Sequence, residues 1–151
     1  MHSEDTSQEI MNTVRSRMGD RIDEYRIPPP VFEFMQGQLV AFDPDEGSLI
    51  AQFPVVESYL NPYSAMQGGM IAAAVDNTLG PLSVLVAAPN LTRQLEMKYS
   101  EPVTLDMEYI FVHAKLLKRE DQRLFFRADV RGPEGNRLAR AKAVHWVLEG
   151  G

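Results

Sequence analysis

The chain of 151 residues contains no cysteine, which excludes disulfide bonds and catalysis by a thiolate. Its 3 histidines are scattered rather than spaced like zinc ligands, so we expect no metal site and no cofactor. Basic residues are in the minority, because 15 Lys and Arg stand against 21 Asp and Glu. Without a basic run, the chain offers no surface for a phosphate backbone, and we expect no nucleic-acid partner.

Hydrophobic runs long enough to cross a bilayer are also scarce. The longest, from Met70 to Ala88, is interrupted in its middle by Asp76, Asn77 and Gly80-Pro81, which a bilayer penalises. We therefore expect a buried helix of a soluble protein that does not enter a membrane. The N-terminus is acidic where a secretory signal is basic, which favours a cytoplasmic protein.

The length allows a single core, preceded by a distinct N-terminal segment. From Glu4 to Tyr25, the apolar residues Ile10, Val14 and Met18 recur every four positions, which predicts an amphipathic helix. Pro28-Pro29-Pro30 then excludes helix and predicts a stiff connector. We divide the chain into this segment, residues 1–30, and a main domain, residues 31–151.

The main domain is expected to begin with a hairpin and a helix. Two β-rich runs, Leu39 to Phe42 and Leu49 to Val56, flank the turn residues Asp43 to Gly47. After Gln67 the chain is apolar on every side, which predicts a helix wrapped by sheet, with Gly80-Pro81 kinking it or ending its regular part.

Four strands in series should follow. Their short links predict an antiparallel meander, and the apolar residues of the third alternate with polar ones, so that one face points inward. The expected strands are Thr92 to Ser100, Asp106 to Lys115, Leu124 to Val130 and Leu138 to Leu148. The predicted fold class is α+β: an antiparallel sheet around one long central helix, with an extra N-terminal helix.

The segment from Asn61 to Asp76 carries the strongest indication of chemistry. Gly68-Gly69 begins the central helix, and Asp76 follows two turns later. The first amides of a helix lack internal partners and lie at the positive end of its dipole, and glycine lets a ligand approach them closely. The pattern predicts an oxyanion hole for a thioester carbonyl.

Asp76 is a lone carboxylate on this apolar helix, where burial would disfavour its charge unless a partner or a task holds it there. It would act as a general base on water or as a nucleophile that forms an anhydride, and both roles stay open. Eight residues of helix separate it from Gly68 by about 12 Å, so the two cannot reach one carbonyl in one chain. If both act on the same carbon, Asp76 must meet Gly68 of a second, antiparallel helix in a two-fold dimer.

Asn61, Gln67-Gly68-Gly69 and Asp76, followed by the strand from Thr92 and the break from Tyr99 to Pro102, resemble the hotdog-fold thioesterases of the phenylacetate-pathway type, within the 4-hydroxybenzoyl-CoA thioesterase superfamily. The resemblance covers roughly residues 37 to 148. It implies a hotdog fold and hydrolysis of an acyl-CoA or aroyl-CoA by a homodimer or homotetramer.

The same resemblance implies roles for individual residues. The amide of Gly68 would polarise the carbonyl, Asp76 of the neighbouring subunit would drive the attack, Asn61 would orient the carboxylate or the water, and Thr92 would position that water. The family often has histidine before the two glycines, whereas Gln67 donates a hydrogen bond but does not titrate. The expected substrate-binding residues are Tyr63, Met66, Gly69 and Met70, with Tyr63, Met66 and Met70 as candidates for the acyl pocket.

Structural interpretations remain beside the functional ones. Gly68-Gly69 could serve only as a tight entry into the helix, and Asn61-Pro62 only as a turn. Asp76 could serve only to accept a structural hydrogen bond. The remaining candidates are interpreted as structural: His113 and His145 as strand residues, Gly132 to Asn136 as a hairpin turn, and Arg137, Arg140 and Lys142 as a solvated strand face in preference to a site for CoA phosphates.

Two other functions suit the same fold. One is a non-catalytic acyl-CoA or fatty-acyl binding protein, which would keep the groove without the chemistry of Asp76. The other is a hotdog hydratase or dehydratase, which usually needs a histidine with an acid at the helix start, where this chain has Gln67. Release of CoA thiol discriminates hydrolysis from both.

Overall fold

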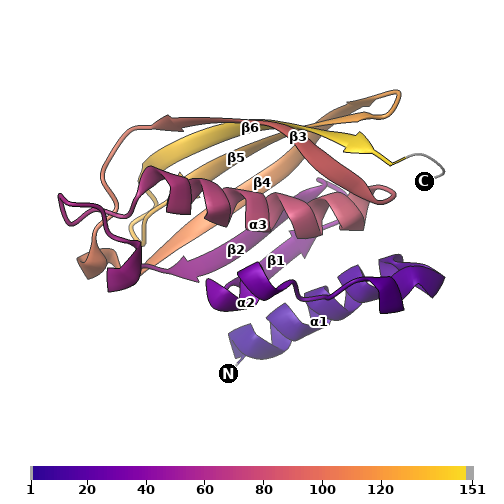
Figure 1. The fold of residues 1–151 in the computed structure, drawn as a ribbon, viewed down its shortest axis with the longest axis horizontal. Coiled ribbons are helices and arrows are strands. Elements are labelled where there is room, and N and C mark those ends of the chain that lie inside the picture. The colour runs from indigo at the N-terminus through magenta and orange to yellow at the C-terminus, as the bar shows by residue number, and fades with distance from the viewer. Residues whose placement is uncertain (1, 149–151) are drawn as a thin grey trace.

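The computed structural model describes residues 2–148, so the last three residues of the predicted domain 31–151 lie outside it. Within this range a six-stranded antiparallel sheet lies across the helix α3, and two further helices lie beside it (Figure 1). The helices are α1 (His2–Arg17), α2 (Pro30–Phe34) and α3 (Gly68–Val86), with short 3-10 segments at Gly19–Glu24, Glu57–Tyr59 and Leu105–Met107. The strands are β1 (Gln38–Asp43), β2 (Ser48–Pro54), β3 (Asn90–Tyr99), β4 (Tyr109–Glu120), β5 (Arg123–Arg131) and β6 (Arg137–Val147). The predicted α+β architecture, with a central helix and an extra N-terminal helix, is confirmed.

The order of strands in the sheet is β1-β2-β4-β5-β6-β3. The predicted hairpin is present as β1 and β2, but the predicted meander of four strands is wrong at its start. β3 pairs with β6, with Thr92 opposite His145, and not with β4. The segment after Tyr99 carries the chain back across the sheet through the 3-10 turn Leu105–Met107, and this turn delays the start of β4 to Tyr109.

The N-terminal segment also differs from its prediction. The α1 helix ends at Arg17 rather than near Tyr25, because Gly19 adopts the left-handed conformation, with a φ of +61°. The proline run is a shorter connector than expected. Pro30 begins α2, where its missing N–H is no loss because the first helical residue has no acceptor.

The central helix continues through Gly80-Pro81 to Val86, so the prediction that these residues end its regular part is wrong. The clash that a proline imposes on the preceding Cβ is absent because Gly80 has none. Beyond the proline, Leu82 is fully buried and Leu85 is 7% exposed, so packing on the sheet stabilises the last turns.

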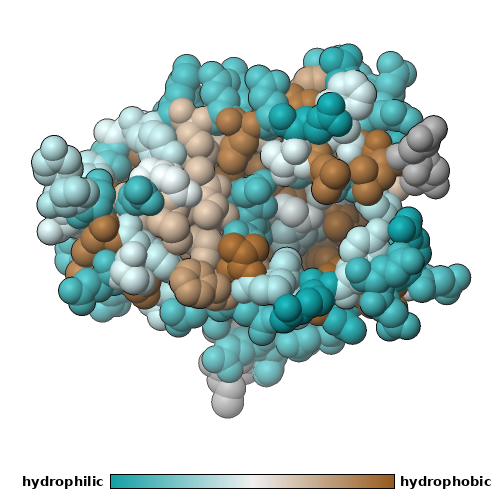
Figure 2. Space-filling model, in the orientation of Figure 1, coloured by the Kyte–Doolittle hydropathy of each residue, from teal (hydrophilic) through white to brown (hydrophobic). Residues whose placement is uncertain are grey.

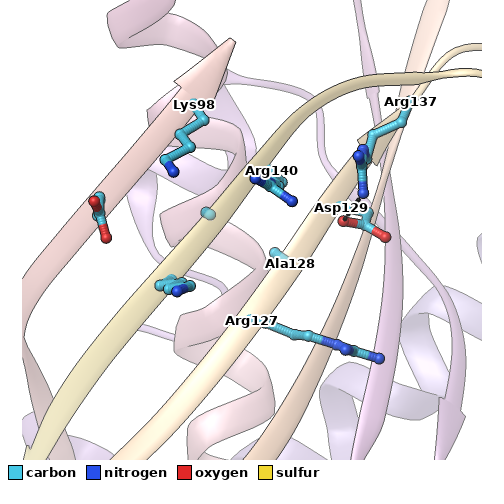
Figure 3. Close-up of a pocket in the computed structure, with 9 residues that line it drawn as sticks. Lys98, Arg127, Ala128, Asp129, Arg137 and Arg140 are labelled. Atoms are coloured by element: carbon cyan, nitrogen blue, oxygen red, sulfur yellow. Dashed lines mark ion pairs between the residues drawn. The ribbon is translucent and has the colours of Figure 1, made fainter. Parts of the chain in front are cut away.

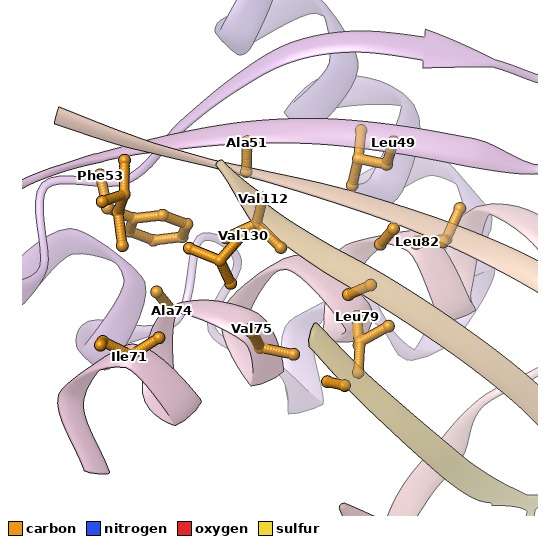
Figure 4. Close-up of a cluster of buried hydrophobic side chains, with 14 of the residues drawn as sticks. Leu49, Ala51, Phe53, Ile71, Ala74, Val75, Leu79, Leu82, Val112 and Val130 are labelled. Carbon is orange, nitrogen blue, oxygen red and sulfur yellow. The ribbon is translucent and has the colours of Figure 1, made fainter. Parts of the chain in front are cut away.

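The core lies between α3 and the concave side of the sheet (Figure 4). Val75, Leu79 and Leu82 of α3 are fully buried there, opposite strand residues that include Phe53 and Val112. Burying one such side chain contributes about 1.5–3 kcal/mol. The predicted inward face of β5 is confirmed, because its residues are at most 1% exposed: Leu124, Phe126, Ala128 and Val130.

The sheet covers only one side of α3. The helix is long and apolar enough to cross a membrane by length and composition, yet its buried residues make it the core helix of a soluble fold. The predicted central helix on the sheet is present, but its outer face is open in the single chain, because Gly69 and Asp76 are exposed and Ala72 and Ala73 are only partly buried. Apolar atoms accordingly gather over the middle of this face (Figure 2).

Candidate active site

The start of α3 presents two free backbone amides. Gln67 is the N-cap residue, and its carbonyl oxygen accepts the N–H groups of Met70 at 2.9 Å and Ile71 at 3.1 Å. Among residues 2–148, no acceptor faces the N–H of Gly68 or of Gly69. Both donors therefore lie at the positive end of a 19-residue helix, where they can stabilise a developing oxyanion.

Tyr99 of β3 packs against this helix start. Its hydroxyl donates a hydrogen bond of 2.7 Å to the carbonyl oxygen of Gly68, and burial raises the pKa of Tyr99, so that the phenol stays a donor. A Cβ atom on Gly68 would lie 3.1 Å from the Tyr99 ring carbon Cζ, which is tighter than ordinary contact. A side chain at this position would therefore have to push the Tyr99 ring away by a few tenths of an ångström.

Asn61 lies beside the same helix start. Its Oδ1 accepts the N–H groups of Tyr63 at 2.9 Å and Ala65 at 3.1 Å, which closes the turn before α3. Asn61, Gly68 and Tyr99 line one cavity of about 320 Å³. The structure therefore brings Asn61 to the oxyanion-hole end of the helix, in the same chain as Gly68.

The predicted substrate-binding residues are dispersed around this end. Met66 is only 3% exposed and belongs to the core, whereas Tyr63 is 88% exposed. Gln67 and Gly69 are exposed, and Met70 is partly buried against the core.

Asp76 lies two turns further along α3 and is exposed in the single chain, contrary to the expected burial. Its Oδ1 accepts a hydrogen bond of 2.9 Å from the Thr92 hydroxyl. The adjacent side chains of Asn77 and Thr78 donate instead to the helix carbonyls of Ala73 and Ala74. The structure thus joins two predicted site residues, Asp76 and Thr92, directly.

His145, which no local pattern in the chain selects, lies behind Thr92. Its Nε2 is 3.3 Å from the Thr92 hydroxyl oxygen, and its Nδ1 is 2.8 Å from Oδ1 of Asn90. The Asn90 amide nitrogen donates to the carbonyls of Ala88 and Ser83, so its Oδ1 is the acceptor and the histidine proton belongs on Nδ1. Only the pairing of β3 with β6 brings this group to the site.

The environment of His145 favours the neutral imidazole. The residue is 1% exposed, and its ring lies 4.8 Å from that of Phe126. Burial lowers the pKa of His145, and the negative charge of Asp76 opposes this shift by raising it. The neutral ring turns an Nε2 lone pair toward Thr92.

The two halves of the predicted machinery occupy different cavities. Asp76 and Thr92 line a cavity of about 370 Å³, whereas Gly68 and Asn61 line the cavity at the helix start. Eight residues of helix, or about 12 Å, separate them. One chain therefore presents the Asp76 carboxylate and the free amides of the helix start to different spaces.

Basic residues gather elsewhere, on the outer face of the sheet. Lys98, Arg127, Arg137 and Arg140 surround a cavity of about 300 Å³ (Figure 3). Asp129 accepts from Arg131 at 3.2 Å and lies 4.0 Å from Arg137. The sheet separates this cluster, which also includes the predicted Lys142, from α3 of the same chain.

The remaining candidates have structural places. Gly132 to Asn136 form the turn between β5 and β6, in which the Gly132 N–H donates to the Asn136 carbonyl at 2.9 Å. The His113 side chain is exposed on β4, but part of it is covered by its neighbours. This partial burial, together with the positive charge of Arg131, lowers the pKa of His113. Over the described part of the chain, no three His, Asp or Glu side chains are grouped to hold a metal ion.

No model of a known protein family matches the sequence, and a search of curated proteins finds no match. Solved structures do resemble the chain. A phenylacetic acid degradation-related protein of Ralstonia eutropha matches with a TM-score of 0.76 and 24% identity, over 89% of this chain and 98% of that one. The Escherichia coli PaaI protein of the phenylacetic acid degradation operon matches with a TM-score of 0.75 and 10% identity, over 93% of this chain and 97% of that one.

A hypothetical thioesterase protein of Streptococcus pneumoniae, solved with coenzyme A, matches with a TM-score of 0.68 and 18% identity, over 74% of this chain and 85% of that one. The chain thus has the hotdog fold of the phenylacetic acid degradation thioesterases.

Proposed function

We propose that the protein hydrolyses acyl-CoA or aroyl-CoA thioesters to the free acid and coenzyme A. The observation that carries the proposal is the exposed Asp76 carboxylate held by Thr92, on the same helix that begins with the free amides of Gly68 and Gly69. The resemblance to a thioesterase protein solved with coenzyme A supports the same substrate class. Acyl-CoA hydrolysis also agrees with the expected cytoplasmic location.

The proposed active form is a two-fold dimer, or a tetramer made of two such dimers. Antiparallel packing of two α3 helices would bring Asp76 of one subunit to Gly68 of the other and unite the two separate cavities. The exposed face of α3 supports this, because Gly69, Ala72 and Ala73 allow two helices to approach closely. The edge strand β3 supports it too, since its outer backbone groups are free to pair with a second copy.

In this assembly the substrate carbonyl oxygen would accept the Gly68 N–H of one subunit. The negative charge that develops on this oxygen during attack is stabilised more than the neutral carbonyl, so the transition state is favoured over the bound substrate. Asp76 of the other subunit would take a proton from water as the water oxygen attacks, or would attack the carbonyl carbon itself. In the first route the C–S bond then breaks, and the CoA thiolate takes the proton that Asp76 removed from water. In the second route the C–S bond breaks as Asp76 forms a mixed anhydride and CoA leaves as the thiolate; water would then hydrolyse the anhydride, which restores the Asp76 carboxylate and supplies the proton for the thiol.

The test is thiol release from acetyl-, octanoyl-, benzoyl- and phenylacetyl-CoA. We expect the native protein to release thiol and Asp76→Asn to lose about 10²–10⁴-fold in kcat, the usual contribution of a general base. Because Asp76 is exposed, the variant should keep its circular dichroism spectrum and its oligomeric state. Binding of these compounds without thiol release would overturn hydrolysis in favour of an acyl-CoA binding protein, and loss of enoyl-thioester absorbance without thiol would favour a hydratase.

A further inference from the structure

The cavity next to Asp76 extends away from the carboxylate between α1 and the C-terminal half of α3. It has a volume of about 370 Å³, and Figure 2 shows apolar atoms in the hollow over this region. Of its polar side chains, Asp76, Thr92, His145 and Asn90 belong to one hydrogen-bonded group. Asn77 and Ser83 donate to carbonyls of α3, Tyr25 is partly buried, and Arg26 is exposed. Much of the remaining lining is apolar, including Met11, Val14, Met18, Ile27, Pro81 and Val84.

The wall that α1 contributes is fixed to the rest of the fold. Met11 and Val14 are 4% and 3% exposed, so they are part of the core. Arg17 donates a hydrogen bond of 3.3 Å from its Nε to the carbonyl of Val84 on α3. Arg15 donates to the carbonyl of Ile27, which ties the connector to α1. The N-terminal segment, which lies outside the family resemblance, therefore forms one ordered wall of the cavity.

Gly80 leaves space on the opposite wall. It lies four residues after Asp76, hence one turn further on the same face of α3, and Val84 follows one turn later. A Cβ atom on Gly80 would meet nothing within 4 Å. Asp76, Gly80 and Val84 thus form a line from the carboxylate along the cavity, and the glycine in its middle leaves the space empty.

We propose that this cavity binds the acyl group of the substrate, and that the N-terminal segment selects uncharged apolar acyl groups larger than acetyl, such as a medium alkyl chain or an arylacetyl group. The proposal rests on the proposed thioesterase function. With the thioester carbonyl at Asp76, the acyl chain extends along Gly80 toward Val84 and Met18. None of the predicted acyl-pocket residues, Tyr63, Met66 and Met70, lines this space.

Because the wall is apolar, kcat/KM should rise gradually with the length of the acyl chain. Each methylene that the cavity buries should raise kcat/KM by about fourfold, equivalent to about 0.8 kcal/mol, until the space is full. A charged acyl group would lose its hydration against this lining and would be rejected. The native enzyme should therefore prefer octanoyl-CoA or phenylacetyl-CoA to acetyl-CoA, and succinyl-CoA should be a poor substrate.

Two opposite substitutions test the cavity. Gly80→Leu fills the empty space, and we expect the ratio of kcat/KM for octanoyl-CoA to that for acetyl-CoA to fall at least tenfold. Met18→Ala enlarges the far wall and should move the preferred chain length upward. Ser16→Leu adds the same side chain to an exposed position of α1 outside the cavity and should leave the chain-length profile of the native enzyme unchanged.

The outcomes separate this proposal from the function on which it rests. If the native protein hydrolyses acyl-CoA and neither substitution changes the chain-length profile, the cavity is not the acyl site. If no acyl-CoA is hydrolysed, the proposed function fails, and displacement of a fluorescent fatty acid by octanoate, compared between the native protein and Gly80→Leu, tests the cavity alone. Gly80→Ala, with a smaller expected fall in the ratio, replaces Gly80→Leu if the larger side chain prevents folding.

Discussion

Oδ1 of Asn90 accepts the Nδ1 proton of His145 at 2.8 Å, and this one contact decides how the neighbouring groups share their protons. With Nδ1 protonated, Nε2 of the neutral ring is an acceptor. The Thr92 hydroxyl has a single proton and two acceptors, Nε2 at 3.3 Å and the Asp76 carboxylate at 2.9 Å. The hydroxyl proton points mainly to the charged group at the shorter distance, with Nε2 as a second, weaker acceptor of the same proton, so Thr92 holds Asp76 in place and His145 orients the hydroxyl.

Loss of the Thr92 hydroxyl should therefore reduce catalysis rather than stability. A hydrogen bond to a charged group contributes about 1.5–3 kcal/mol, so Thr92→Ala should lower kcat by about ten- to hundredfold. Thr92→Ser, which keeps the hydroxyl, should restore most of the rate. Steady-state kinetics would measure both, and equal rates for the alanine and serine variants would contradict the role of the hydroxyl.

His145 should act through Thr92, as a positioning residue. His145→Gln keeps a polar group near the Nε2 position, whereas His145→Leu leaves the Thr92 oxygen against an apolar group. We expect the leucine variant to lower kcat more than the glutamine variant, with KM little changed, because the residue acts on the acid and not on the bound substrate. A fall in kcat of the same size in both variants, together with the same loss of thermal stability, would indicate a structural role only.

The buried histidine should also make stability depend on pH. Burial lowers the pKa of His145, so near pH 6 the unfolded chain binds a proton that the folded chain does not. The stabilisation is complete above the unfolded pKa of about 6.5 and is lost as pH falls below it, at up to about 1.4 kcal/mol per pH unit for each proton. Urea unfolding between pH 5.5 and 7.5 measures this slope.

His145→Gln should reduce the dependence of the unfolding free energy on pH, but not abolish it. His113 also has a lowered pKa, through burial and Arg131, so His113→Gln is the matched variant for its separate contribution. A slope that His145→Gln leaves unchanged would show that the imidazole titrates alike in the folded and unfolded chains.

The two glycines at the start of α3 should differ in their tolerance of a methyl group. A Cβ on Gly68 lies 3.1 Å from Tyr99 Cζ, whereas a Cβ on Gly69 meets only Oε1 of Gln67, at 3.8 Å. Gly68→Ala should displace the amide from the oxyanion and lower kcat/KM at least tenfold, with a smaller effect for Gly69→Ala. Thiol-release kinetics of the pair would check this, and the reverse order would assign the oxyanion contact to Gly69.

Isotope labelling separates the two routes open to Asp76. In a single turnover in H₂¹⁸O, general-base catalysis places the label in the acid product. If Asp76 attacks and water then opens the anhydride at the aspartyl carbon, the product takes an unlabelled oxygen from the carboxylate and the label enters Asp76. Mass spectrometry of the product and of the peptide that contains Asp76 identifies the route.

Local patterns predicted most of the helices and strands, and they selected the candidate residues on α3. Gly68-Gly69 and Asp76 stand out because glycine and a lone acid are unusual on an apolar helix, and the alternation in β5 gave its buried face. What the sequence did not reveal depends on contacts between distant segments. His145 has no local signal of function, since its partner Thr92 is 53 residues away and meets it only through the β3–β6 pairing.

The same limit explains the errors in the fold. The exposure of Asp76 follows from the sheet covering only one side of α3, which the all-round apolar composition concealed. The continuation of α3 past Pro81 depends on the burial of Leu82 and Leu85 by the sheet. The cavity beside α1 was missed because its lining comes from four separate elements of the chain.

The two edges of the sheet differ in a way that limits assembly. At β1, the Ser7 hydroxyl of α1 accepts the Leu39 N–H at 2.8 Å, and a bulge between Leu39 and Ala41 distorts the strand. The edge strand β3 also has a bulge, between Thr92 and Gln94, so the difference lies in the cover: α1 obstructs strand addition at β1, whereas no helix covers β3 within the described chain. If two molecules pair through β3, the free edges of the joined sheet are the two β1 strands, which α1 covers. The sheet would therefore stop growing at a dimer and could not extend into a fibril.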